Sequence, residues 1–222
     1  MLFDVDGTLI TTGGAGRKAI VRSFEKAFGQ EGITLPFSFA GMTDRLIVRK
    51  GLEALGLSAQ EAAIDQVLED YLETLADEVE RAERYFVHPG MLAALEALKD
   101  RPGVALGLGT GNLEAGARIK LERVQLNHYF SFGGFGCDAE DRNALILEGA
   151  WRGAKLLERS LKACRVVIIG DTPRDVEAAR FVGGECIAVA TGGATWEELE
   201  QTRPDWLFEN LEADGALEAL LG

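Results

Sequence analysis

The chain has 222 residues, of which 47% are apolar and 27% charged, values typical of a folded globular protein. Its net charge of −13 opposes binding to nucleic acid or to an anionic membrane surface. No apolar run approaches the roughly 18 residues that a membrane-spanning helix needs, and the N-terminus lacks the pattern of a signal peptide. The three cysteines are scattered and form no CxxC pair, as expected of reduced thiols, so we expect a cytoplasmic protein.

Short apolar runs alternate with helical periodicity along most of the chain, which predicts an α/β fold with a parallel sheet. One helical pattern is spaced by Leu147, Trp151 and Ala154. We therefore expect a doubly wound, Rossmann-like parallel sheet. The runs expected to form its strands are residues 2–5, 104–109, 130–135, 166–170, 186–190 and 206–208.

Residues from about 12 to 87 break this alternation, because they contain three helical patterns and no convincing strand. We interpret them as an all-helical unit inserted between the first and second strands of the sheet. The expected domains are a core of residues 1–12 and 88–222 and a helical insertion of residues 13–87.

The third helical pattern of the insertion is the clearest. Ser58 and Glu61 form a capping box, and an apolar stripe at spacings of three and four runs through Tyr71 to Phe86. The two earlier patterns cover residues 19–28 and 43–55.

Acidic residues follow two of the predicted strands. Asp4 and Asp6 lie at the end of the first strand, and Asp171 and Asp175 follow the strand at 166–170. Because ligands bind at the carboxyl ends of parallel strands, four carboxylates should gather at one edge of the sheet. Such a cluster repels itself unless a cation lies within it, and oxygen ligands suit Mg²⁺. The sequence therefore predicts metal-assisted chemistry on an anionic substrate.

Three segments resemble motifs of the haloacid dehalogenase superfamily. Residues 3–9, FDVDGTL, are similar to its DxDGT(L/I) motif, and residues 107–112 resemble its second motif, a strand that ends in Thr or Ser. Residues 170–175, GDTPRD, look like its GDxxxD motif. The resemblance covers essentially the whole chain, and the layout is closest to the phosphoglycolate phosphatase branch, whose members carry a helical cap where this chain has its insertion. It implies a Mg²⁺-dependent phosphatase of small phosphorylated metabolites.

The resemblance also suggests a role for each matching residue. Asp4 would attack phosphorus and form an aspartyl-phosphate intermediate. Asp6 would act as general acid and base, a task that requires a pKa raised toward neutrality. Thr110 would hydrogen-bond a phosphoryl oxygen, with Gly111 and Asn112 binding the substrate beside it. The residues expected to hold Mg²⁺ are Asp4, Asp6 through its backbone carbonyl, Asp171 and Asp175. Asp175 also fits an ordinary first turn of a helix.

The chain departs from the family at its third motif, a Lys that is often followed by Pro. Arg142 lies nearest that position and is our candidate for a catalytic cation, although pairing with surface acids is an alternative. A cation at a helix N-terminus is disfavoured, and a broken local rule at a predicted site points to function. Lys120 and Lys155 are rivals. Lys120 lies about 12 Å down a helix that should lead away from the strand ends, which argues against its reaching the site.

The sequence does not name the substrate. The segments 13–17 and 41–45 of the insertion are expected to contact it, and Arg17 or Arg45 would bind a carboxylate or a second phosphate unless it lies on a solvated helix face. A phosphomutase or a weakly catalytic binding protein on this fold are the alternative functions. A hydrolytic dehalogenase is disfavoured because that branch lacks the second acid, Asp6. We expect a monomer or homodimer with no nucleic-acid or membrane partner.

Overall fold

The computed structural model describes residues 1–222 and contains a six-stranded parallel sheet. Its strands are β1 (Leu2–Phe3), β4 (Gly107–Gly109), β5 (Phe132–Gly134), β6 (Val167–Gly170), β7 (Glu185–Val189) and β8 (Trp206–Phe208). The strand order is β5-β4-β1-β6-β7-β8, and every neighbouring pair is parallel. The chain builds outward from β1 on one side and then crosses to build on the other. The carboxyl end of β1 therefore lies at the switch point where open sheets bind ligands.

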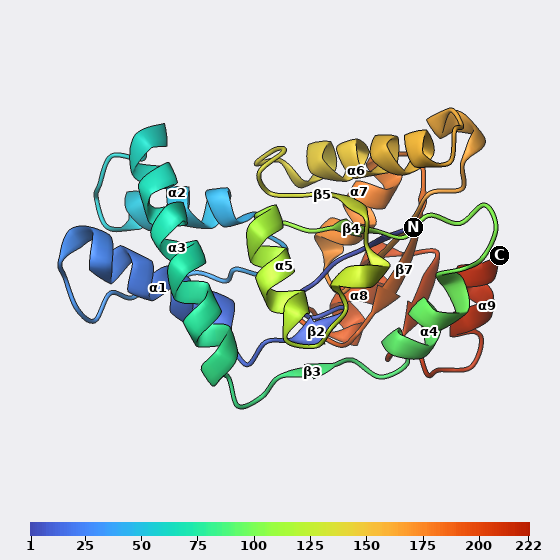
Figure 1. The fold of residues 1–222 in the computed structure, drawn as a ribbon, viewed down its shortest axis with the longest axis horizontal. Helices are drawn as coiled ribbons and strands as arrows, with labels where there is room; N and C mark the ends of the chain where they lie inside the picture. The colour runs from blue at the N-terminus through green and yellow to red at the C-terminus, as the bar shows by residue number, and fades with distance from the viewer.

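Helices cover both faces of the sheet, as Figure 1 shows. One face packs against α4 (Met91–Leu98), α5 (Glu114–Glu122) and α9 (Ala216–Leu221), and the other against α6 (Arg142–Leu156), α7 (Pro173–Phe181) and α8 (Trp196–Thr202). Adjacent residues of a central strand point to opposite faces of the sheet. In β1, Phe3 belongs to the apolar cluster shared with α4, α5 and α9, and Leu2 belongs to the cluster shared with α6, α7 and α8. Burial on both faces explains why the strands are continuous apolar runs.

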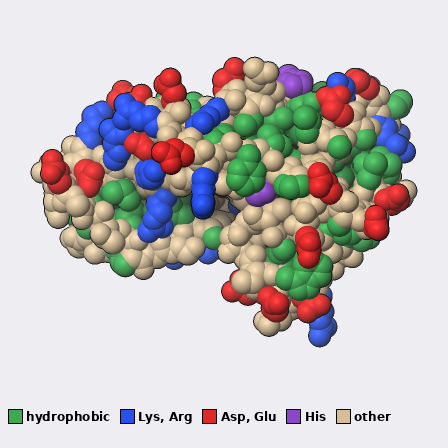
Figure 2. Space-filling view, turned by 90° about the horizontal axis from the view of Figure 1, so that it is seen from below, with side chains coloured by type: hydrophobic (Ala, Val, Ile, Leu, Met, Phe, Trp, Pro, Cys, Tyr) green, Lys and Arg blue, Asp and Glu red, His purple; other side chains and the backbone are tan.

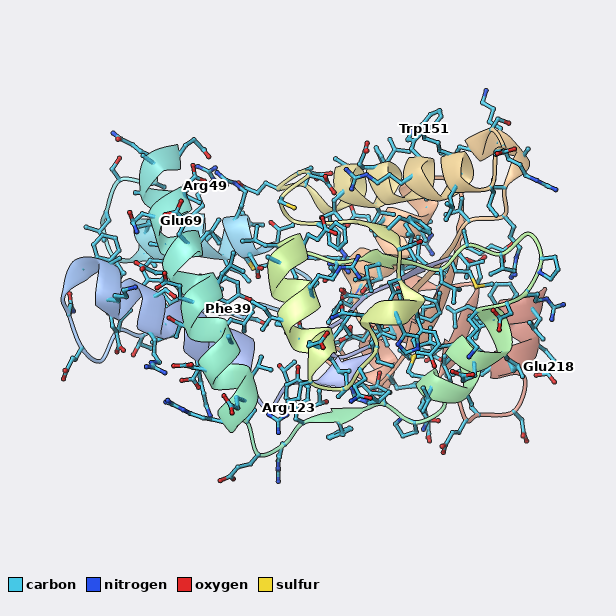
Figure 3. All side chains as sticks on the ribbon, in the orientation of Figure 1. Phe39, Arg49, Glu69, Arg123, Trp151 and Glu218 are labelled. Carbon is cyan, nitrogen blue, oxygen red and sulfur yellow. The ribbon has the colours of Figure 1, made fainter.

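Helix α6 forms where the sequence predicts a helix and buries Ala154 as expected, but Trp151 does not lie on its buried face. Trp151 is 54% exposed and points away from the molecule (Figure 3). The buried face includes Gly149 and Gly153, and a Cβ at Gly149 would lie 2.7 Å from the backbone nitrogen of Gly134. The helix thus approaches the sheet through small residues, which a search for large apolar side chains cannot detect.

The insertion is all-helical, apart from its junctions with the core. It contains α1 (Ala15–Phe28), α2 (Asp44–Ala54) and α3 (Glu61–Arg81), which with their loops we call the three-helix unit. This unit has an apolar cluster of its own and lies to one side of the sheet in Figure 1. The predicted fold class, a doubly wound parallel sheet with a helical insertion, is confirmed. The domain boundaries near residues 12 and 88 stay a prediction.

Two details of the insertion differ from the sequence-based expectation. The strands β2 (Ile10–Thr11) and β3 (Phe86–Val87) form an antiparallel pair where the chain enters and leaves the three-helix unit. Phe86 therefore belongs to a strand and not to the third helix, which ends at Arg81. Strands of two residues are too short to produce an alternating pattern.

The capping box predicted from Ser58 and Glu61 is wrong. The residue that precedes α3 is Gln60, and its side chain makes no capping hydrogen bond. The Glu61 carboxylate instead accepts hydrogen bonds from Arg45 and Arg49 of α2. A charged partner from another helix has replaced the local backbone contact that the pattern predicted.

Several charged side chains of the three-helix unit form ion pairs with one another. On the face shown in Figure 2, Lys and Arg side chains gather over this unit among acidic ones. Lys26 lies 3.0 Å from Glu73, and Arg45 lies 2.7 Å from Asp65. No helix in the structure has the length and apolar character required to cross a membrane.

The three-helix unit contacts the core through the start of α2. The Asp44 backbone N–H donates to the carbonyl of Gly111 at 2.8 Å, and Asp44 Oδ2 accepts from the Leu113 N–H at 2.8 Å. Further out, Arg49, labelled in Figure 3, binds both carboxylate oxygens of Glu140 at 3.0 and 3.1 Å. These contacts link the unit to the loop after β4 and the loop before α6.

Gly90, at the start of α4, should be irreplaceable for stability. Its φ is 78°, and a Cβ there would lie 2.2 Å from the carbonyl carbon of Leu211. Gly103 has a φ of 76° but nothing within 4 Å, so it is a matched control. Gly103→Ala should cost about 1–2 kcal/mol in the free energy of unfolding, and Gly90→Ala about 1–3 kcal/mol more, because backbone must move. Equal shifts of the urea midpoint would contradict this.

Candidate functional site

A cavity of about 280 Å³ lies between the carboxyl edge of the sheet and the three-helix unit. Its lining from the core is polar, and its lining from the three-helix unit is largely apolar. The core contributes Asp4, Asp6, Thr110, Asn112, Lys120, Arg142 and Asp171. The three-helix unit contributes Gly16, Arg17, Ile20, Phe39, Met42, Asp44, Ile47 and Tyr71.

Parallel pairing explains why residues far apart in the sequence meet in this cavity. Asp4 follows β1, Thr110 follows β4 and Asp171 follows β6, and both of the latter strands pair with β1. The turn after Asp6 depends on Gly7, whose φ is 84°. A Cβ on Gly7 would lie 2.5 Å from Asp171 Oδ2, so glycine lets the two strand ends approach closely.

Three buried carboxylates form a tight cluster. Oxygens of Asp4, Asp171 and Asp175 lie within 4.8 Å of one another. Burial raises the pKa of Asp4 to about 6, although the charge of Arg142 opposes the rise. Burial and the charges of Asp4 and Asp175 raise the pKa of Asp171 to about 8. The cluster therefore cannot ionise fully near neutral pH without additional positive charge, and its oxygens could hold a metal ion.

Arg142 supplies part of that charge from within the protein. It is buried, its Nη2 lies 2.9 Å from Asp4 Oδ2, and it also donates to Asp175 Oδ1. Asp175 Oδ2 accepts from the Thr172 N–H at 3.0 Å. The alternative that Arg142 pairs with acids on the surface is wrong. Asp175, whose two oxygens are both engaged, orients the guanidinium toward Asp4.

Lys120 also reaches the cavity, which corrects the expectation that it would fall short. It is 3% exposed, and its Nζ lies 2.6 Å from Asp6 Oδ2 and 2.5 Å from Asn112 Oδ1. Helix α5 does not lead directly away from the strand end. It lies between the sheet and the three-helix unit (Figure 1), so a long side chain on its inner face turns back into the cavity.

Asn112 connects the remaining polar groups. Its Nδ2 donates to Asp6 Oδ2 and to Thr110 Oγ1, both at 2.8 Å. Burial would raise the pKa of Asp6, but the Lys120 charge and the hydrogen bonds from Lys120 and Asn112 outweigh burial and lower it. The raised pKa that we expected for Asp6 is therefore not found in this arrangement.

Two of the candidate cations lie outside the cavity. Arg45, expected to contact substrate, is bound by Glu61 and Asp65 on the surface of the three-helix unit and does not line the cavity. Its assignment as a substrate-binding residue is wrong, because acids on α3 take up its charge. Lys155 is exposed on α6.

Arg17 lines the cavity, but it is exposed and two of its five N–H groups donate to backbone carbonyls. Its Nη1 donates to the carbonyl of Phe37 at 3.1 Å and its Nη2 to that of Leu35 at 2.7 Å. The guanidinium carbon lies 4.3 Å from the centre of the Phe39 ring. Arg17 thus holds the loop between α1 and α2, and no carboxylate pairs with it.

Two cavity residues were not singled out by the sequence. Asp44 is buried, and burial raises its pKa to about 6, although the charge of Lys120 and the Leu113 N–H oppose the rise. Tyr71 is fully buried, and its hydroxyl has no hydrogen-bond partner. Asp44 lies in segment 41–45, which the sequence predicts to contact substrate, so its presence in the cavity could have been predicted. Tyr71 fits the apolar stripe of α3 and gave no signal apart from its hydroxyl.

A family model described as haloacid dehalogenase-like hydrolase matches residues 1–183 of the chain. Among curated relatives, the chain is 28% identical to phosphoglycolate phosphatase 1 of Pseudomonas aeruginosa, and the match covers 100% of this chain and 82% of the relative. It is also 28% identical to a phosphoglycolate phosphatase of Synechococcus elongatus, and this match covers 94% of the chain and 92% of the relative. Among solved structures, CbbY of Rhodobacter sphaeroides in complex with phosphate superposes with a TM-score of 0.76 at 19% sequence identity. The match covers 98% of this chain and 97% of CbbY.

The Lys120–Asp6 contact should control the ionisation of Asp6. Lys120→Met removes the charge and the hydrogen bond that lower the Asp6 pKa, while burial remains, so we expect this pKa to rise. A ¹³C NMR titration of the labelled aspartate carboxyls, with a chelator present to remove metal ions, would measure the Asp6 pKa. Lys155→Met, which removes an exposed lysine, should leave the Asp6 titration unchanged. An unshifted Asp6 in Lys120→Met would contradict the assignment.

Proposed function

The chain belongs to the haloacid dehalogenase-like hydrolase family, and on this basis we propose that it is a Mg²⁺-dependent phosphatase that hydrolyses small phosphomonoesters through an aspartyl-phosphate intermediate. The observation that carries the proposal is the different surroundings of the two acids at the end of β1. Asp4 lies against Arg142 and the acidic cluster, whereas Asp6 lies against Lys120. Two carboxylates in distinct environments suit two distinct roles.

The donor set fits Mg²⁺. All available groups are oxygens, and Asp171 is enclosed so tightly that a Cβ on Gly192 would lie 2.1 Å from its Oδ2. We propose Asp4, the Asp6 backbone carbonyl and Asp171 as ligands. Asp175 would support the site mainly by holding Arg142, whose positive charge its Oδ1 already binds. When bound, Mg²⁺ would neutralise part of the charge of the phosphoryl group.

In the first step, an Asp4 oxygen would attack phosphorus, and the bond from phosphorus to the leaving oxygen would break. Asp6 would protonate the leaving oxygen. The arriving phosphoryl group adds negative charge beside Asp6 and so raises its pKa from the low value set by Lys120. In the second step, Asp6 would take a proton from a water that attacks phosphorus, which releases phosphate and regenerates Asp4.

The other core residues would bind the transferring group. The Thr110 hydroxyl accepts hydrogen bonds from Asn112, so its own proton is free to be donated to a phosphoryl oxygen. Arg142 and Lys120 would supply fixed positive charge on either side. The alternative of a weakly catalytic binding protein is supported only by the absence of the family's third-motif Lys. Arg142 and Lys120 supply two buried cations in the cavity, so this absence no longer argues against catalysis. No observation favours a phosphomutase.

The first test is hydrolysis of an aryl phosphate with Mg²⁺ and with a chelator. We expect turnover only with Mg²⁺, and Asp4→Asn should lower kcat by about 10³ or more because an amide is a poor nucleophile. Phosphate label should be trapped on Asp4 after an acid quench. Asp214→Asn, which changes an exposed acid, is the control. Label on another residue, or an active Asp4→Asn, would refute the mechanism.

Mg²⁺ affinity should increase with pH. Without metal, the pKa values of Asp4 and Asp171 are raised to about 6 and about 8, and the protonated carboxyls must lose their protons to bind the ion. Affinity should therefore rise between about pH 5.5 and 8.5. Calorimetric titration in two buffers of different ionisation enthalpy should also detect proton release. Binding that neither varies with pH nor releases protons would contradict this prediction.

A further inference from the structure

Arg49 and Glu140 form the only ion pair between the three-helix unit and the core. The Arg49 Nε lies 3.0 Å from Glu140 Oε1, and the Arg49 Nη2 lies 3.0 Å from Glu140 Oε2, so the guanidinium faces both carboxylate oxygens. A two-point contact of this kind fixes the orientation of the two groups as well as their distance. The other ion pairs of the unit, such as that of Arg22 with Glu78, join residues within it.

The other hydrogen bonds between the unit and the core each involve a neutral group. The Asp44 N–H donates to the Gly111 carbonyl, and the Asp44 carboxylate accepts from the Leu113 N–H. Arg123 of the core donates to backbone carbonyls at the end of α3. Because salt screens the attraction between two opposite charges, the ion pair is the contact between unit and core that ionic strength weakens most.

The Arg49–Glu140 ion pair is accessible to solvent. The two side chains are 27% and 28% exposed, whereas those of Arg142 and Asp4, which form an ion pair within the core, are 6% and 7% exposed. Charges that are partly hydrated already lose little when the pair separates. The Arg49–Glu140 pair therefore suits a contact that forms and breaks reversibly.

The ion pair lies away from the two connections that join the unit to the core. The chain enters and leaves the unit through β2 and β3, which lie at the lower edge of Figure 1, whereas α2 lies at the upper edge. Figure 3 shows Arg49 at this upper edge. In a rotation of the unit about β2 and β3, the parts farthest from these strands move most. Such a rotation would separate Arg49 from Glu140 and widen the cavity.

Separation of α2 from the core would open the cavity without dismantling its polar side. Asp44 and Ile47 of α2 line the cavity and would move with the unit. Arg142 begins two residues after Glu140, but it is held by the buried carboxylate of Asp175 in the core. The ion pair thus controls how the cavity is covered and leaves the acidic cluster in place.

We propose that the Arg49–Glu140 ion pair is a latch that holds the three-helix unit over the cavity. Release of the latch lets the unit swing about β2 and β3 and opens the cavity to solvent and to ligands. Higher ionic strength favours the open state. The inference goes beyond the proposed phosphatase activity, and its test requires no substrate.

Two amide groups report whether the unit is docked on the core. Asp44 begins α2 and Leu113 precedes α5, so neither N–H has an acceptor in its own helix, and both are bonded across the interface. Glu140→Gln removes one charge of the latch and should accelerate hydrogen exchange at both amides about fivefold, measured by NMR. Exchange of the Asp4 N–H, which is bonded to the Ile169 carbonyl within the core, should not change.

Glu78→Gln is the matched control, because Glu78 pairs with Arg22 inside the unit. It should leave exchange at Asp44 and Leu113 unchanged. Raising NaCl to about 0.5 M should accelerate exchange at these amides in the unmodified protein and in Glu78→Gln, and much less in Glu140→Gln. Unchanged exchange in Glu140→Gln, or an equal effect of salt in all three proteins, overturns the latch.

A thiol introduced by Ile20→Cys tests access to the cavity directly. Ile20 lines the cavity from α1 and is 1% exposed, so modification of the thiol requires the unit to open. Adding Glu140→Gln should make its reaction with N-ethylmaleimide about fivefold faster, followed by peptide mass spectrometry, and adding Glu78→Gln should not. Equal rates with and without Glu140→Gln overturn the control of access. Absence of Asp4-dependent hydrolysis would refute the proposed function alone.

Discussion

The structure depends on a concentration of buried negative charge at the carboxyl ends of β1 and β6. Each acid there has a different set of partners. Asp4 lies beside the Arg142 guanidinium, Asp6 beside the Lys120 ammonium, and Asp171 accepts hydrogen bonds from Thr8 and the Gly193 N–H. Burial raises the pKa of Asp4 and of Asp171 although these partners oppose the rise, whereas the charge and hydrogen bond of Lys120 help to outweigh burial and lower the pKa of Asp6. Five buried or lining carboxylates, including Asp44 and Asp175, face only two buried cations, so the site carries an excess of negative charge that a bound cation would offset.

Much of this arrangement could be predicted from the sequence, because parallel strands end at one edge of the sheet. Asp4, Thr110 and Asp171 each follow an apolar run, and their meeting requires only that the runs be neighbouring strands. Arg142 could be placed for the same reason, since α6 begins soon after β5. Lys120 could not, because its position depends on the direction in which α5 packs. That direction is set by contacts with the three-helix unit, which no local pattern contains.

The absence of tertiary contacts from local sequence patterns also explains the other differences between the predicted and the observed site. Arg45 carries the positive charge expected of an anion-binding residue, but Glu61 and Asp65 of α3 neutralise that charge. Only the tertiary structure brings α2 and α3 together in this way. Tyr71 matches the apolar spacing of a core residue and is indeed fully buried, yet its hydroxyl has no hydrogen-bond partner. Periodicity predicts which face of a helix is buried. It does not predict whether the atoms at the tip of a side chain meet other protein atoms or an enclosed space.

The docking of the three-helix unit has a consequence for the geometry of the cavity. The backbone N–H and carboxylate of Asp44 both bind the loop that follows β4, the loop that also carries Thr110 and Asn112. A Cβ on Gly111 would lie 2.3 Å from the carbonyl oxygen of Met42, so this close approach requires glycine. The packing of α3 against α5 and the hydrogen bonds from Arg123 to the carbonyls of Val79 and Ala82 add to this link, so the three-helix unit is held over the strand ends at more than one place. A change in the size of the cavity would therefore have to break hydrogen bonds made by α2 and by the end of α3 together.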